Sequence, residues 1–165
     1  MTERSKIIAF AGRKRSGKGM LAKGMREYSP NVVIIAVADS LKILCCKLLK
    51  ITYDELTQMK DDGTTFEAKV DDYWVSTIKH EVKISDNIIR NEIGEHIFTN
   101  VREVLQIIGT DLIRKYSPDW HIDKTIEHIK SYGDDKIVVV EDVRFPNEKR
   151  RIEEIGGDVY FIIRP

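Results

Sequence analysis

A glycine-rich run near the amino end has the residue types and spacing of a phosphate-binding loop. Gly12-Arg13-Lys14-Arg15-Ser16-Gly17-Lys18 satisfies the pattern G-x-x-x-x-G-K, between an apolar run and a stretch that favours a helix. Glycines let backbone N–H groups converge on a phosphate without Cβ clashes, and the following helix start adds about half a positive charge. Lys18 can then follow the charge that moves during phosphoryl transfer. The structural alternative is a glycine-rich turn with surface lysines.

The residues after Lys18 depart from the common form of this motif. A Ser or Thr usually follows the lysine and binds Mg²⁺ through its hydroxyl, but here Gly19 and Met20 follow. We therefore expect no metal held firmly by protein, and Mg²⁺ would arrive with the nucleotide. The loop cations Arg13, Lys14 and Arg15 are either solvated or in contact with phosphate. Among them we assign Arg15 a catalytic role. The expected nucleotide-binding residues are Gly12, Arg13, Lys14, Ser16, Gly17, Lys18, Gly19 and Met20.

Two acids end the apolar run Ile137-Val138-Val139-Val140, and they are candidates for metal chemistry. A carboxylate at the carboxyl end of a parallel strand faces the ligand crevice, so Asp142 could orient a water molecule on Mg²⁺. Arg144 follows two residues later and should point to the same side. The alternative is that Asp142 pairs with Arg144 or caps the next helix.

Asp39 stands in a comparable place after a second apolar run, Val32–Val37. It is either a helix N-cap or a residue that faces the phosphoryl acceptor, with Lys42 one turn further along.

A polar stripe follows one side of the helix predicted over Val101–Lys115. Two arginines of the stripe could hold a phosphate bidentately and a glutamine could contact a base edge, although a solvated helix face is the alternative. Trp120, beside the predicted helix start at Ser117-Pro118, could stack on a base or pack in the core. The stripe consists of Arg102, Gln106, Thr110 and Arg114.

Other side chains capable of chemistry lack a functional pattern. The four histidines show no HExxH or similar ligand spacing, so we expect no protein-held transition metal. Cys45 and Cys46 are adjacent, and we interpret them as small apolar residues of a helix.

The elements that must position these residues alternate between apolar strands and helices. This alternation predicts an α/β fold with three layers, in which helices flank a mostly parallel central sheet. The pair Thr52 and Glu55 predicts a capped helix start, with Ile51 against Leu56. Residues 84–98 stay ambiguous between helix and hairpin, and Phe66, Val70, Trp74 and Ile78 hint at a helix. Four core strands are expected at about 7–11, 32–37, 137–140 and 159–163, and helices at about 20–28, 39–50 and 146–155.

The composition narrows the class of protein. A length of 165 residues suits one domain, and the 27 basic residues equal the 27 acidic ones, which disfavours a dedicated nucleic-acid binder. No apolar run approaches the ~20 residues that span a bilayer, and the amino end does not resemble a secretory signal. We expect a cytoplasmic protein without a membrane partner.

Four stretches of the sequence resemble the deoxynucleoside monophosphate kinases of phages and their bacterial relatives. The first is the glycine-rich loop, and the others are similar to the family elements "FADPLK", "VRELLQ..GTE" and "DVRFPNE". In this chain the last three read Val37-Ala38-Asp39-Ser40-Leu41-Lys42, Val101-Arg102-Glu103-Val104-Leu105-Gln106-Ile107-Ile108-Gly109-Thr110-Asp111 and Asp142-Val143-Arg144-Phe145-Pro146-Asn147-Glu148. Residues 51–99 do not align and would form a variable acceptor-side insert in a single P-loop kinase domain. Family members usually continue past Pro165 with a lid-like segment and a last strand.

The resemblance implies transfer of the ATP γ-phosphoryl group to a deoxynucleoside monophosphate, in a bacterium or a phage-infected host. The partner would be a small nucleotide, and a homodimer stays open. The catalytic residues would be Lys18, Arg15, Asp142 and Arg144, with Mg²⁺ held through water to Asp142. The acceptor would contact Asp39, Lys42, Arg102, Gln106, Arg114 and Trp120.

Two other functions fit parts of the sequence. The glycine-rich loop also resembles that of animal phosphomevalonate kinase, which would make the acceptor another phosphorylated metabolite. A nucleotide-binding module without catalysis is the alternative from a different class, suggested by Gly19 and Met20 in place of a hydroxyl residue.

Overall fold

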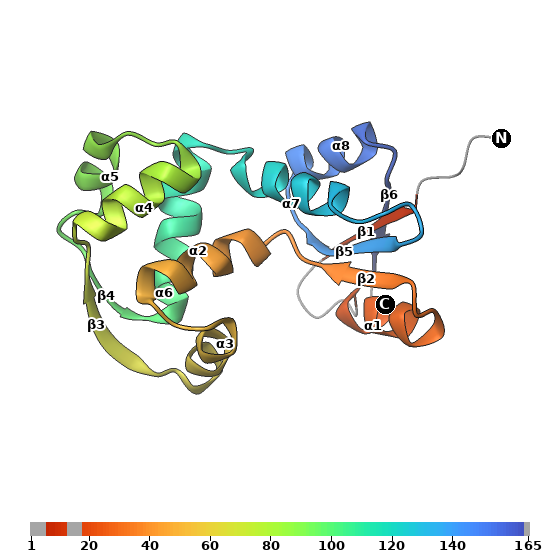
Figure 1. The fold of residues 1–165 in the computed structure, drawn as a ribbon, viewed down its shortest axis with the longest axis horizontal. Coiled ribbons are helices and arrows are strands. Elements are labelled where there is room, and N and C mark those ends of the chain that lie inside the picture. Colours follow the sequence, from red (N-terminus) through yellow and green to blue (C-terminus); the bar gives the residue numbers. More distant parts are fainter. Residues whose placement is uncertain (1–5, 13–17, 164–165) are drawn as a thin grey trace. The chain divides into compact units, whose positions relative to one another are not determined.

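The fold comes from a computed structural model that describes residues 6–12 and 18–163; of Lys18 it describes the backbone alone (Figure 1). The chain divides into two compact units. The first combines the residues up to Asp39 with those from His121 onward, and the second comprises Ser40–Trp120.

The first unit is built on a four-stranded sheet in which every neighbouring pair of strands is parallel. Its strand order is β2-β5-β1-β6. The elements are β1 (Ile7–Gly12), α1 (Lys18–Tyr28), β2 (Val32–Ile35), α7 (Trp120–Lys130), β5 (Ile137–Val143), α8 (Pro146–Glu154) and β6 (Asp158–Ile162). The expected α/β architecture with a mostly parallel sheet is confirmed.

Helices cover both faces of this sheet. On one face, Ala22 of α1 packs with Phe10 and Val139. On the other face, Ile126 of α7 and Ile152 of α8 pack with strand residues. Because both faces are covered, β5 contains consecutive buried valines, Val138–Val140, instead of an alternating pattern.

The second unit is mainly helical and has its own apolar core. A two-stranded antiparallel sheet lies beside the helices. Its elements are α2 (Asp39–Leu49, with Asp39 from the first unit), α3 (Tyr53–Asp62), β3 (Thr65–Lys69), α4 (Asp72–Val82), α5 (Asp86–Ile93), β4 (Ile97–Asn100), α6 (Val101–Gln106) and the π-helix η1 (Ile107–Arg114). The adjacent cysteines lie on α2 as interpreted, and Cys45 is fully buried in this core.

Local sequence signals placed several helix ends correctly. Thr52 and Glu55 form the predicted capping box of α3, and Pro146 is in the first turn of α8 as expected. Asp71 and Ser85, which were not predicted as caps from the sequence, cap α4 and α5 through side-chain bonds to backbone N–H groups.

Two expectations for the middle of the chain need correction. The helix suggested by Phe66, Val70, Trp74 and Ile78 exists only from Asp72 onward, because Thr65–Lys69 forms strand β3. Side chains of β3 alternate between exposed and half-buried, the period of a strand against β4. The ambiguous segment 84–98 contains helix α5 and the first two residues of strand β4.

The helix expected over Val101–Lys115 forms, but it changes type midway. It is α-helical up to Gln106 and π-helical over Ile107–Arg114. Over two turns a hydrophobic pattern does not distinguish a period of about 3.6 residues from the wider π-helical one, and π-helical turns are rare.

Across the described residues, no helix has the length and apolar character needed to cross a bilayer.

Candidate functional site

The carboxyl ends of β1 and β5 form the point where the sheet connections diverge. From β1 the chain crosses one face through α1 to β2, and from β5 it crosses the other face through α8 to β6. Since β1 and β5 are neighbours, their connections leave in opposite directions, which opens a crevice at the strand ends in folds of this kind.

The predicted phosphate loop joins β1 to α1 at this point. Gly12 is the last residue of β1 and Lys18 the first of α1, so the order strand–loop–helix agrees with the motif. Arg13, Lys14, Arg15, Ser16 and Gly17 lie outside the described residues, and their roles stay predictions. Met20, which replaces the hydroxyl residue, is 80% exposed on α1.

A β-bulge lies near the carboxyl end of β5. Ala9 pairs with Val140 and Ala11 pairs with Val143, so Glu141 and Asp142 together oppose the single residue Phe10. The extra residue breaks the two-residue alternation, and Val140 and Val143 therefore pack on the same face. Asp142, at the bulge, belongs to neither of the apolar layers that cover the two faces of the sheet.

The Asp142 carboxylate contacts the end of the neighbouring strand. Its Oδ1 accepts a hydrogen bond from the Val37 N–H at 2.6 Å. Burial raises the pKa of Asp142 above its ordinary value, against the opposing effects of the Val37 amide and the Arg144 guanidinium. The ionised form of a half-buried acid of this kind is stabilised when a cation or a cation-bound water comes near its carboxylate.

Neither structural alternative for Asp142 is observed among the described residues. Asp142 and Arg144 form no salt bridge there, and Arg144 is exposed. The N-cap of α8 is Phe145, not Asp142.

Glu148 caps the start of α8, and it was not predicted from the sequence as a capping residue. It is 1% exposed, and its Oε1 accepts hydrogen bonds from the N–H groups of Arg144 and Phe145. A Glu three residues after a helix N-cap is a known capping pattern, so Phe145-Pro146-Asn147-Glu148 could have identified it. Its carboxylate holds the backbone that carries Arg144.

Asp39 closes the turn after β2. Its Oδ2 accepts from the Ala36 N–H at 2.9 Å, and its own N–H donates to the Ala36 carbonyl. Because Asp142 binds Val37 within the same turn, two carboxylates hold the backbone where the chain leaves the sheet. This turn also explains why β2 ends at Ile35 and not at Val37.

The other predicted acceptor residues belong to the second unit. Arg102 and Gln106 are exposed on α6, whereas Arg114 on η1 and Lys42 on α2 are half-buried. Trp120 is 7% exposed in the core, and its indole N–H donates to the Glu81 carbonyl, which is the packing alternative weighed above.

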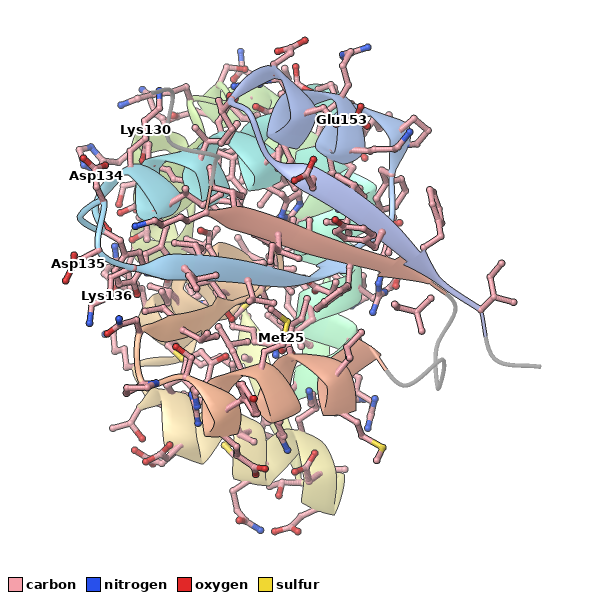
Figure 2. The ribbon with its side chains drawn as sticks, turned by 90° about the vertical axis from the view of Figure 1, so that its right-hand side faces the viewer. Met25, Lys130, Asp134, Asp135, Lys136 and Glu153 are labelled. Carbon is pink, nitrogen blue, oxygen red and sulfur yellow. The ribbon has the colours of Figure 1, made fainter. Side chains whose placement is uncertain are left out.

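A separate cleft of about 680 Å³ opens at the opposite, amino-terminal edge of the sheet. Figure 2 shows Lys130, Asp134 and Lys136 at this edge. Lys6 there donates to the Asp134 carbonyl, and Lys130 ends α7, where a cation complements the helix dipole. Lys6 and Lys130 thus have a structural use, and we place the candidate site at the carboxyl ends of the strands.

Within the described ranges no three His, Cys, Asp or Glu side chains are grouped as a metal site would need.

Comparison with known proteins gives one informative match. The chain is 26% identical over 170 residues to a protein of Acanthamoeba polyphaga mimivirus that is named, provisionally, as a deoxynucleotide monophosphate kinase. The alignment covers 96% of this chain and 74% of the viral protein. No family model matches the chain. The match indicates a distant relationship to a protein named as a nucleotide kinase.

Proposed function

We propose that the protein transfers the γ-phosphoryl group of ATP to a deoxynucleoside monophosphate, with ADP and the deoxynucleoside diphosphate as products. The observation that supports this most is the similarity to the mimivirus protein along 96% of the chain. The strand–loop–helix order at Gly12 and Lys18, with Asp142 on the adjacent strand, agrees with it.

In this scheme the first unit binds ATP. Backbone amides of residues 12–19 and the Lys18 ammonium hold the phosphates, and Arg15 and Arg144 offset charge on the moving phosphoryl group. When bound together with ATP, Mg²⁺ would supply positive charge that offsets the charge developing on the phosphates. Asp142 fits a water-mediated contact to it, because its Oδ1 is fixed by Val37 while burial disfavours an uncompensated charge.

The acceptor would be held by residues that follow β2 and by the second unit. Asp39, Lys42, Arg102, Gln106 and Arg114 provide the charges and hydrogen-bonding groups, and contact of a base with Trp120 would require its indole to leave the core. No covalent intermediate is needed, because positioning and charge stabilisation account for catalysis of phosphoryl transfer.

A coupled assay that detects ADP tests this function. We expect turnover of ATP with at least one of dTMP, dGMP, dCMP and dAMP, and little with the matching deoxynucleosides, which lack the accepting phosphate. The assay should use the full chain with Mg²⁺. Failure of all four monophosphates to support ADP formation would contradict the proposal, and turnover of phosphomevalonate would redirect it.

A nucleotide-binding module without catalysis is the second candidate, and Met20 is the observation that favours it. Such a module would bind ATP with an affinity that does not depend on Mg²⁺, and it would transfer no phosphoryl group.

A further inference from the structure

Three cationic side chains from three helices come together in the second unit. Lys42 lies in the first turn of α2, Lys60 in the last turn of α3 and Arg102 in the first turn of α6. The three helices share one apolar core, and α3 packs against α6 (Figure 1). Lys42 and Arg102 both lie within electrostatic range of Lys60.

The position of Lys60 is set by a helix that is capped at both ends. Thr52 and Glu55 exchange hydrogen bonds at the start of α3, and Leu56 is 1% exposed in the core. At the other end Gly63 has φ 65°, and its N–H donates to the Lys60 carbonyl. Lys60 is itself half-buried, so its stem is confined as well as its backbone. A binding residue needs this kind of rigid support.

The positive charges of Lys42, Lys60 and Arg102 are not balanced by salt bridges among the described residues. Lys42, Lys60 and Arg102 form no salt bridge with any carboxylate of the described part of the chain. Burial, and then the charge of Lys42, lowers the pKa of Lys60; Arg102 adds to this effect and Asp61 opposes it. Like charges that are partly buried destabilise one another, and an anion among them removes that cost.

A simpler role for Lys60 is to complement the dipole at the carboxyl end of α3. That role accounts for a lysine in the last turn, but not for the approach of cations from two other helices. The combination of partial burial, rigid support and converging positive charge is characteristic of a site for a small anion.

The geometry points to Lys60 as a further acceptor-binding residue, which joins Lys42 and Arg102 around the phosphate group of the monophosphate. This inference rests on the proposed function and deepens it, because Lys60 lies in the segment 51–99 that no motif covers. A phosphate monoester carries nearly two negative charges at pH 7 and three acceptor oxygens. Two ammonium groups and a guanidinium can donate to those oxygens, with the guanidinium able to bind two at once. The site therefore selects a monophosphate over the uncharged deoxynucleoside.

The test is calorimetric titration of the full chain, without ATP, with dTMP, dGMP, dCMP and dAMP and with each matching deoxynucleoside. For the monophosphate that binds most tightly, Lys60→Gln should weaken binding about 10- to 100-fold, the range for loss of a hydrogen bond to a charged group. Lys60→Arg should restore most of the affinity, because charge and donors return. Binding of ATP to the Lys18 region should not change.

Lys69→Gln is the matched control, because Lys69 is an exposed lysine of the same unit on β3, and it should bind like the parent protein. Lys60→Met retains the apolar stem and serves if the glutamine variant fails to fold. Wild-type affinity in Lys60→Gln or Lys60→Met would overturn the role of Lys60 while leaving the proposed kinase intact. Absence of any monophosphate binding by the parent chain would overturn both.

Discussion

Asp142 is the proposed catalytic residue whose contacts the structure describes in most detail. A carboxylate that is disfavoured by burial would be replaced by an amide or an apolar group if only packing mattered. Instead it stands at a bulge, beside the end of β1, with one oxygen committed to Val37. In the proposed function, this charged group would lower stability and serve the reaction.

Asp142→Asn should therefore separate stability from activity. The folded-state pKa of Asp142 is raised, so its neutral form favours folding; that contribution is complete below the unfolded value of 3.8 and is lost as pH rises through the raised folded value. The asparagine does not ionise and can still accept from Val37. The free energy of unfolding of Asp142→Asn, relative to that of the parent, should therefore be larger at about pH 7 than at about pH 3.5. Urea unfolding of both proteins at these two pH values measures the difference.

The same variant should lose about 10- to 100-fold in turnover, the range for residues that orient a metal's outer ligands. Full activity of Asp142→Asn, or stability that falls relative to the parent as pH rises, would remove Asp142 from this role.

At the scale of elements, the connection from α8 to β6 depends on a close approach. A Cβ on Gly157 would lie 2.6 Å from Ile152 Cγ2 and 3.0 Å from both the Ile152 carbonyl and Ile7 Cγ2. Gly157 also donates its N–H to the Ile152 carbonyl, so the backbone has little room to move away. This contact brings the end of α8 onto the sheet beside β1.

Gly157→Ala should destabilise the protein by about 1–3 kcal/mol, as overpacking of a filled site does. Gly24→Ala is the matched control, because Gly24 lies within α1 and a Cβ there would meet nothing within 4 Å. That change should be neutral or stabilising by up to ~1 kcal/mol, since alanine favours helices over glycine. Chemical denaturation of both variants measures the difference, and equal effects would show that the contact at Gly157 is not tight.

At the scale of the whole molecule, each compact unit has its own core. The proposed ATP residues belong to the first unit, and the proposed phosphate contacts Lys42, Lys60 and Arg102 belong to the second. The two ligands should consequently stabilise different parts of the chain.

Amide hydrogen exchange with each ligand alone checks this division of roles. ATP should slow exchange mainly around β1 and α1, and an accepted monophosphate mainly in α2, α3 and α6, with protection up to about 2.7 kcal/mol at a hundredfold excess over Kd. Lys18→Ala should abolish most protection by ATP and leave that by the monophosphate. Monophosphate protection confined to the first unit would contradict the assignment of the acceptor.

Local patterns determined a large part of this protein. Strands β1, β2, β5 and β6, the capping box at Thr52 and the helix start at Pro146 follow from residues that are neighbours in sequence, because burial on both sheet faces and end-capping are local requirements. The pattern at Gly12–Lys18 and the acids Glu141 and Asp142 are also local features, and the proposed class of chemistry was predicted from them.

Other features depended on residues that only folding brings together. Strand β3 forms because β4, about thirty residues away, pairs with it, and the bulge that turns Asp142 toward Val37 is defined only against β1. Lys60 matched no motif, since its surroundings come from three separate helices. A sequence pattern records what each segment can form, whereas the charges and hydrogen bonds that surround a side chain are set by packing between distant segments.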